Sequence, residues 1–205
     1  MKILNIILYV FLIVSLCSSL VYCNFIYDDG TGNPPALEGE GEGEGEGEGE
    51  GEKIPIGSDV GNMCPSYALE LVDGSGKVSV KDFRGKIVIV NFWGIWCGPC
   101  KQELPDFDEV ANEYDGEVVV LTVHSVNDKD GAPSYIEENF PDSKMLFAYD
   151  TPLTEYVDVY FNLLGGKSSY PRTLILDENG VIVLARDGKV SHQQLVDTIE
   201  EIKNK

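Results

Sequence analysis

The amino-acid sequence predicts an α/β fold: a central mixed sheet flanked by helices, with an added β-hairpin at its N-terminal end. Two apolar runs, Ile87–Trp93 and Glu117–His124, have the length and composition of central strands covered on both faces. Ser191 is a good N-cap for a closing helix over Gln193–Lys203, where apolar residues recur at helical spacing. This order of elements indicates a sheet with helices on both faces.

The other elements follow from turn residues and apolar periodicity. The turn-rich stretch Asp73–Gly76 predicts the N-terminal hairpin, and Glu178-Asn179-Gly180 predicts a second hairpin near the C-terminus. In chain order we expect strands at Tyr67–Val72 and Val78–Val80, a helix that follows the Cys97–Cys100 pair and ends near Tyr114, a short helix at Ser134–Asn139, a strand at Met145–Tyr149, a helix at Leu153–Leu164, and strands at Arg172–Asp177 and Val181–Arg186.

Composition divides the chain into residues 1–23, 24–54 and 55–205. Gly and Glu alternate without a break from Gly39 to Glu52 in the middle part. Such a segment cannot bury enough apolar surface to offset its loss of conformational entropy, so we expect a disordered linker that acts as a spacer. The last part is long enough for one well-buried domain.

The first part has one charge, at Lys2, and an uncharged run from Ile6 to Tyr22. It predicts a signal peptide or a short membrane anchor. Cys23 is a candidate for lipid attachment and Cys17 a second one, although a large residue precedes each. Three alternatives stay open: a lipid anchor, an uncleaved helix and plain secretion. Each places the domain outside the cytoplasm, and the first two tether it to the outer face of a bacterial cell membrane.

The charge of the chain excludes some partners. The formal net charge is −20, and residues 1–52 contribute ten acidic residues and one lysine to it. An acidic domain lacks the basic patches that neutralise nucleic-acid phosphates, so we expect no nucleic-acid binding. We also expect a monomer.

The motif Trp96-Cys97-Gly98-Pro99-Cys100 carries the chemistry. Cys97 falls where a buried strand ends and a helix begins, and the positive end of a helix favours a thiolate. Cys100 lies one turn further on the same face, so the two sulfurs can form a reducible bridge. Cys97 is then the nucleophile and Cys100 the resolving thiol.

Two other interpretations of the pair are weaker. A structural zinc site needs about four ligands, and the domain offers only Cys64, His124 and His192 beyond the pair. A structural disulfide that closes so short a loop would restrict the unfolded chain little. We therefore expect no metal and no cofactor other than the redox-active Cys97–Cys100 disulfide.

The runs KIVIVNFWGIWCGPCKQELP and YPRTLILDENGVIV resemble the thioredoxin superfamily, and more narrowly its TlpA/ResA-like extracytoplasmic thiol–disulfide oxidoreductases. The similarity covers about Pro55 to Lys205 and implies a thioredoxin-like fold. It implies that Cys97 and Cys100 are the redox pair and that Pro171 is a cis-proline packed across the disulfide. The backbone of Tyr170 would pair with an extended substrate there, beside Trp96, Gly98 and Pro99. Taken alone, Pro171 fits an ordinary loop proline before an edge strand better than a cis-proline of an active site.

Two positions differ from cytoplasmic thioredoxin. Asn91 occupies the strand position of thioredoxin's buried Asp, and an amide cannot transfer a proton. Glu103 matches the acidic residue that ResA-like reductases carry one turn after the motif. A carboxylate there would exchange the proton of Cys100 and raise the thiol pKa values. The alternative is a solvated helix glutamate.

Three further residues have two interpretations each. Cys64 is either a third redox thiol or a small apolar residue of the core. His124 ends a strand near the active face and is either catalytic or a core residue. His192, beside a helix cap, is expected at the surface.

The sequence therefore predicts an enzyme, a reductase of disulfides in exported proteins. The resemblance implies electrons from a membrane thiol carrier of the CcdA/DsbD type, and cytochrome c maturation is a precedent in the family. Two alternatives stay open: a thiol peroxidase of the AhpC/TSA-like type, and a non-catalytic tethered binding domain.

Overall fold

The computed structural model describes residues 54–154, 157–166 and 169–205. The described residues from Ile54 onward belong to one compact unit of the chain. The predictions for residues 1–23, for the linker up to Lys53 and for Cys17 and Cys23 lie outside these ranges. In the described part of the chain, none of the helices is long and apolar enough to cross a bilayer.

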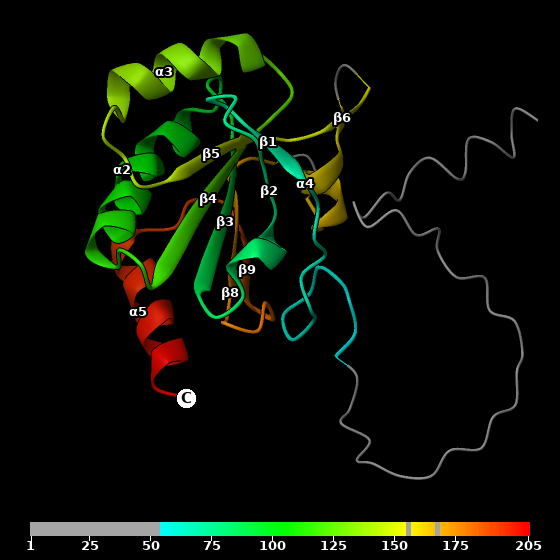
Figure 1. Cartoon of the computed structure of the whole chain (residues 1–205), viewed down its shortest axis with the longest axis vertical. Coiled ribbons are helices and arrows are strands. Elements are labelled where there is room, and N and C mark those ends of the chain that lie inside the picture. Colours follow the sequence, from blue (N-terminus) through cyan, green and yellow to red (C-terminus); the bar gives the residue numbers. More distant parts are fainter. Residues whose placement is uncertain (1–53, 155–156, 167–168) are drawn as a thin grey trace, which may run out of the picture. The chain divides into compact units, whose positions relative to one another are not determined.

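A seven-stranded mixed sheet forms the centre of the domain, in the order β2-β1-β5-β4-β3-β8-β9 (Figure 1). Strands β3, β4 and β5 are mutually parallel, and the other pairs of neighbours are antiparallel. The strands are β1 (Leu69–Leu71), β2 (Lys77–Val78), β3 (Ile87–Trp93), β4 (Val118–His124), β5 (Leu146–Tyr149), β8 (Arg172–Leu176) and β9 (Ile182–Asp187); β6 (Pro152–Thr154) and β7 (Val157–Asp158) form a separate pair.

Helices cover both faces of the sheet (Figure 1). They are α2 (Gly98–Glu113), α3 (Ala132–Asn139), α4 (Val159–Leu163) and α5 (His192–Lys203), with two 3₁₀ turns, η1 (Val80–Phe83) and η2 (Lys129–Gly131). Side chains alternate between the faces along a strand. Accordingly, Ile87 and Ile89 of β3 pack against α2 and α5, whereas Val88, Val90 and Phe92 pack in the opposite core with α4.

The central elements confirm the predicted fold class. β3 has the predicted bounds and is buried along its whole length, as expected for a strand covered on both faces. β4 begins one residue later than predicted. Ser191 caps α5 through a bond from the Gln194 N–H to its hydroxyl, and the Gln194 side chain accepts from the Ser191 N–H. This capping box explains why the helix starts directly after Ser191, at His192, one residue earlier than predicted.

The predicted helix at Leu153–Leu164 is wrong in its first half. β6 and β7 occupy that half, and the helix is confined to α4. The start of α4 is set by Asp150, whose carboxylate accepts hydrogen bonds from the N–H groups of Tyr160 and Phe161. A distant carboxylate that caps the helix cannot be recognised from apolar periodicity.

The predicted strand Val78–Val80 is also too long. Val80 is the first residue of η1 and does not belong to the strand.

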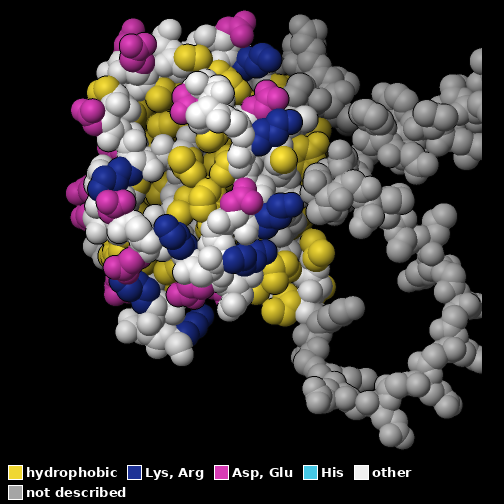
Figure 2. Space-filling view, viewed as in Figure 1, with side chains coloured by type: hydrophobic (Ala, Val, Ile, Leu, Met, Phe, Trp, Pro, Cys, Tyr) yellow, Lys and Arg dark blue, Asp and Glu magenta, His cyan; other side chains and the backbone are white. Residues whose placement is uncertain are grey.

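The surface of the described domain carries both signs of charge, and acidic and basic side chains share the face seen in Figure 2. Some of them form exposed pairs, such as Lys144 with Asp115 and Lys203 with Glu117. Exposed pairs of this kind stabilise a fold little. The stability of the domain therefore comes from the two cores on either side of the sheet.

Candidate functional site: a redox disulfide above a buried carboxyl group

Cys97 and Cys100 form a disulfide at the junction of β3 and α2. Cys97 is the N-cap residue of α2, and its Sγ accepts a hydrogen bond from the Cys100 N–H at 3.2 Å. Pro99 occupies the first turn of the helix, where its missing N–H leaves no bond unmade. Cys100 is fully buried, and Cys97 retains 4% exposure. The positive end of α2 therefore points at the more accessible sulfur, which favours its thiolate in the reduced protein.

Glu103 is fully buried, so the alternative of a solvated helix glutamate is wrong. Its Oε1 accepts a hydrogen bond from the Asn91 side chain at 2.8 Å, and its Oε2 accepts one from the Val190 N–H at 3.0 Å. Burial raises the pKa of this carboxyl from an ordinary 4.5 to about 7, although both hydrogen bonds act to lower it. Glu103 can thus take up or release a proton near neutral pH.

Asn91 holds Glu103 in place from the central strand. Its side-chain amide donates to Glu103 and also to the Thr173 hydroxyl, at 3.1 Å, on the neighbouring strand β8. Asn91 and Thr173 are partners in the β3–β8 register, so their side chains lie on the same face of the sheet. The Asn91 Oδ1 has no hydrogen-bond partner among the described residues. Asn91 is therefore a donor to the carboxyl group and does not titrate.

The Tyr170–Pro171 peptide bond is cis, as the resemblance to thioredoxins implied. The Tyr170 ring stacks on Phe161 with ring centroids 4.3 Å apart, and the Trp96 ring contacts Tyr170 edge-on at 5.2 Å. Trp96 is 48% exposed, and Gly98 and Pro99 are exposed beside it. The structure thus brings Trp96 next to Tyr170, two residues that are far apart in the sequence.

His124 is a core residue, and its position excludes a role as a free base. The ring is fully buried; its Nε2 accepts from the Ile95 N–H at 3.2 Å, and its Nδ1 lies 2.6 Å from the Ser125 carbonyl oxygen. Both contacts are satisfied by a neutral ring with its proton on Nδ1. Burial also lowers the pKa of His124. His124 therefore positions the Ile95 backbone, two residues before Cys97, and does not carry the Cys100 proton.

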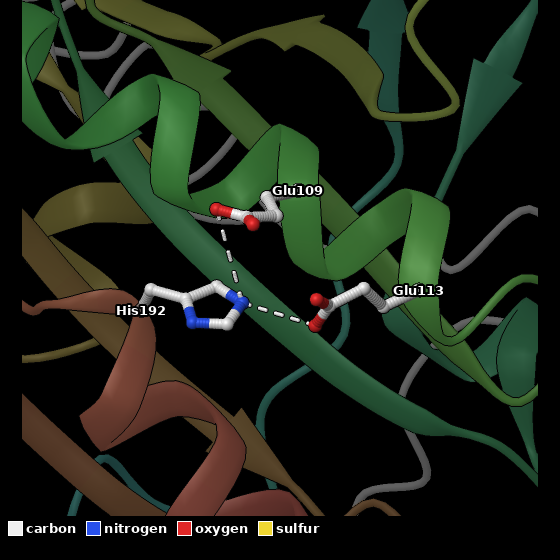
Figure 3. A group of neighbouring side chains, drawn as sticks. All are labelled: Glu109, Glu113 and His192. Atoms are coloured by element: carbon white, nitrogen blue, oxygen red, sulfur yellow. Dashed lines mark hydrogen bonds and ion pairs between the residues drawn. The ribbon is translucent and has the colours of Figure 1, made fainter.

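His192 is partly buried at the start of α5, where a surface position was expected (Figure 3). Its Nε2 lies 3.0 Å from a Glu113 carboxylate oxygen and 4.0 Å from one of Glu109. The three ligand atoms lie within 4.8 Å of one another, a spacing that a metal ion could bridge. Both glutamates are exposed on α2, and their pairing with His192 accounts for the arrangement. The absence of a metal stays a prediction.

Cys64 is a buried core residue. It is 2% exposed, and its thiol contacts the Pro65 carbonyl oxygen and the Tyr160 hydroxyl. Burial raises the pKa of this thiol to about 11. A thiol that stays protonated at neutral pH is a poor nucleophile, so the structure favours the interpretation as a small apolar residue over a third redox thiol.

A hollow of about 420 Å³ opens beside the disulfide on the α3 side. Ile95, Trp96, Lys101 and Tyr135 are among the residues that line it. It therefore adjoins the exposed rim around Cys97, and its lining includes both apolar and charged side chains.

Sequence reasoning missed some contributors to the site. The Val190 N–H is a backbone group and left no signal in the pattern of side chains. Phe161 and Asp158, which contact Tyr170, lie in the segment that was predicted as a helix throughout. The one available signal was a carboxylate at Asp158 within an otherwise apolar run, Val157 to Phe161.

The fold and the disulfide together define a thioredoxin-like thiol–disulfide oxidoreductase. The sequence model of the AhpC/TSA family matches residues 60–185, and the chain belongs to this family.

Proteins that are similar to this chain carry names that fit this class of enzyme. The chain is 30% identical over 152 residues to the thioredoxin-like protein YneN of Bacillus subtilis, which covers 70% of this chain and 80% of that protein. It is 27% identical over 144 residues to the thiol–disulfide oxidoreductase ResA of Bacillus thuringiensis, with 70% and 79% covered. The exposed lipoprotein thioredoxin of Streptococcus pneumoniae superposes with a TM-score of 0.55 at 28% identity, over 67% of this chain and 99% of that one.

Alkylation of the reduced protein should be selective for Cys97. The helix N-terminus favours its thiolate, Cys100 is fully buried, and the pKa of Cys64 is about 11. Limiting iodoacetamide at neutral pH, followed by peptide mapping, should find Cys97 modified first and Cys64 last. Faster modification of Cys100 or Cys64 would reverse the assignment of roles.

Glu103 should make the oxidised protein less stable as the pH rises. Its pKa is raised in the folded state, so its favourable contribution is present below about pH 4.5 and is lost as the pH rises toward 7. The shift corresponds to about 3 kcal/mol of unfolding free energy. Urea unfolding across this range should show the loss in wild type, and Glu103→Gln should lack that component. Parallel pH curves for the two proteins would contradict a raised pKa.

Proposed function

We propose that the protein is a reductase of disulfides in exported proteins, held on the outer face of a bacterial cell membrane. The observation that carries the proposal is the buried Glu103 carboxyl one helical turn beyond Cys100, with a pKa of about 7. Residues three apart on a helix share one face, so the carboxyl lies on the Cys100 side of α2. A group that titrates near the working pH is suited to general acid–base catalysis.

The reaction runs in two exchange steps. In the reduced protein the Cys97 thiolate attacks one sulfur of a substrate disulfide, forms a mixed disulfide and releases the other substrate sulfur as a thiolate. Cys100 then loses its proton to the Glu103 carboxylate and attacks the Cys97 sulfur. The internal disulfide forms and the second substrate thiolate leaves. Two electrons pass from the dithiol to the substrate, and the carboxyl returns its proton when the pair is reduced again.

Two features favour reduction over oxidation. The Gly98-Pro99 insert resembles that of the reducing thioredoxins. A buried carboxylate beside the pair disfavours the thiolate form, and a stabilised thiolate is what makes strong oxidants oxidising. Glu103 therefore moves the couple toward reducing potentials.

The substrate is an extended polypeptide segment that carries a disulfide. The backbone of Tyr170, beside the cis bond to Pro171, would pair with it as an added strand, and the exposed Trp96, Gly98 and Pro99 would form the rim. The ResA relatives are by name thiol–disulfide oxidoreductases, which supports a disulfide as the substrate. We propose a membrane thiol carrier of the CcdA/DsbD type as the electron donor, as the family resemblance implies, with apocytochrome c as the family precedent for the substrate. We propose a monomer tethered by Cys23 lipidation or an uncleaved N-terminal helix; the S. pneumoniae relative is by name a lipoprotein.

The AhpC/TSA family match favours one alternative, a thiol peroxidase. A peroxidase needs an activated thiolate, and Cys64 is buried with its pKa raised to about 11. Activity toward hydrogen peroxide would then depend on Cys97. The third possibility, a non-catalytic binding domain, leaves the disulfide at the helix N-terminus unexplained.

The redox potential and the substrate preference test the proposal together. Equilibration with glutathione or dithiothreitol buffers should give a potential near that of thioredoxin, ~−270 mV, rather than near ~−120 mV of strong oxidants. Insulin should be reduced in the presence of dithiothreitol, with hydrogen peroxide consumed much more slowly. Cys100→Ser should trap mixed disulfides on Cys97. A potential above roughly −180 mV, or faster turnover of peroxide than of insulin, would refute the reductase function.

A further inference from the structure

A buried carboxylate on the α4 side of the sheet has no part in the mechanism described above. Asp158 is 6% exposed and accepts three hydrogen bonds. Its Oδ2 accepts from the Tyr170 hydroxyl at 2.5 Å and from the Ser125 hydroxyl at 2.7 Å, and its Oδ1 accepts from the Val126 N–H at 2.6 Å. One side chain thus joins the loop after β4 to the residue before the cis-proline.

The position of Asp158 makes these contacts unexpected. It is the N-cap residue of α4, where an aspartate usually accepts bonds from the first N–H groups of its own helix. Asp158 makes no such bond. Asp150 caps α4 instead, through the N–H groups of Tyr160 and Phe161. The second carboxylate therefore leaves Asp158 free to bind Tyr170.

Tyr170 transmits the contact to the exposed rim of the redox site. Its ring is held between the stacked Phe161 and the edge-on Trp96, which directly precedes Cys97. Burial and the bond to Asp158 raise the pKa of the Tyr170 phenol, so it remains a donor at neutral pH. The hydrogen bond to Asp158 holds the hydroxyl end of the Tyr170 ring, and the contacts with Phe161 and Trp96 hold the ring itself.

We propose that Asp158 is a positioning residue for substrate binding: through Tyr170 it holds the cis-proline loop and Trp96 in the geometry that an extended polypeptide pairs with. This inference rests on the proposed function, since it assigns a part to the same substrate groove. A loop whose polar and aromatic contacts are fixed in advance loses less conformational entropy when a peptide adds to it as a strand. The contribution of Asp158 is thus to the affinity for polypeptide disulfides.

Kinetics of insulin reduction separate positioning from a general loss of structure. Asp158→Asn removes the carboxylate charge and turns one oxygen into an NH₂ group, so the Tyr170 hydroxyl either loses its acceptor or keeps only a neutral one. Tyr170→Phe removes only the hydroxyl and keeps the ring. Each variant should raise the KM for insulin about tenfold while kcat changes much less, as expected when one charge-assisted hydrogen bond no longer supports binding.

The double variant tests whether the two residues act through one contact. Asp158→Asn combined with Tyr170→Phe should raise KM no more than the stronger single variant, because both remove the charge-assisted bond between the two residues. Asp82→Asn is the matched control: this carboxylate also accepts from a serine hydroxyl and a backbone N–H, both of Ser79, but it lies in η1, before β3 begins. Asp82→Asn should leave the KM at its wild-type value.

A wild-type KM in Tyr170→Phe would overturn the inference, as would additive effects in the double variant. Should Asp158→Asn not fold, Tyr170→Phe decides alone. Insulin reduction by the wild type tests the proposed reductase function, and the KM values of the variants test the positioning role of Asp158, so the failure of one proposal is distinguishable from the failure of the other. If the wild type does not reduce insulin, acrylamide quenching of Trp96 fluorescence still tests the contact without substrate. Trp93 is buried and Trp96 is exposed, so acrylamide quenching reports on Trp96. Quenching should increase in Tyr170→Phe, because the Tyr170 ring is then held less firmly against Trp96. Unchanged quenching would overturn the inference.

Discussion

The active end of the molecule depends on one buried interaction, the Glu103 carboxyl held between the Asn91 side chain and the Val190 N–H. It joins the central strand, α2 and the segment that leads into α5, so the carboxyl group is held in place one helical turn beyond Cys100. The burial that fixes this geometry also raises the pKa of Glu103 to about 7. The fixed position of the Glu103 carboxyl and its raised pKa therefore have the same cause, its burial.

The strand β3 organises the two sides of the site. On one face, Asn91 reaches Glu103 and Thr173. On the other face, Phe92 packs on Tyr160 and Phe161 of α4, and Phe161 supports Tyr170. The strand ends four residues before Cys97, and Arg172 pairs with Phe92 near that end, so the buried Glu103 carboxyl of one face and the Tyr170–Pro171 loop lie at the same end of β3 as the disulfide. A mixed sheet with helices on both faces makes this convergence possible.

The sequence predicted the central part of the fold because that part is governed by local patterns. The apolar run of β3, the Asn179-Gly180 turn and the Ser191 cap each act within a few residues, and each lies where expected. The segment before Leu164 was mispredicted because the start of α4 is set by Asp150. Its carboxylate accepts hydrogen bonds from the N–H groups of Tyr160 and Phe161, which are too far along the chain for a local pattern to reveal the contact. For the same reason the motif located Cys97, Cys100 and Glu103 along the chain, whereas burial of Glu103 and the Asp158 contact required the tertiary structure.

The ionisation of Glu103 tests the central claim most directly. The carboxyl carbon of Glu103, assigned by comparison with Glu103→Gln, can be followed by ¹³C NMR in the oxidised protein, where neither cysteine of the pair titrates. We expect a midpoint near pH 7, well above the ordinary 4.5. A midpoint near 4.5 would contradict it, because a carboxyl that is fully ionised at neutral pH cannot return a proton to Cys100.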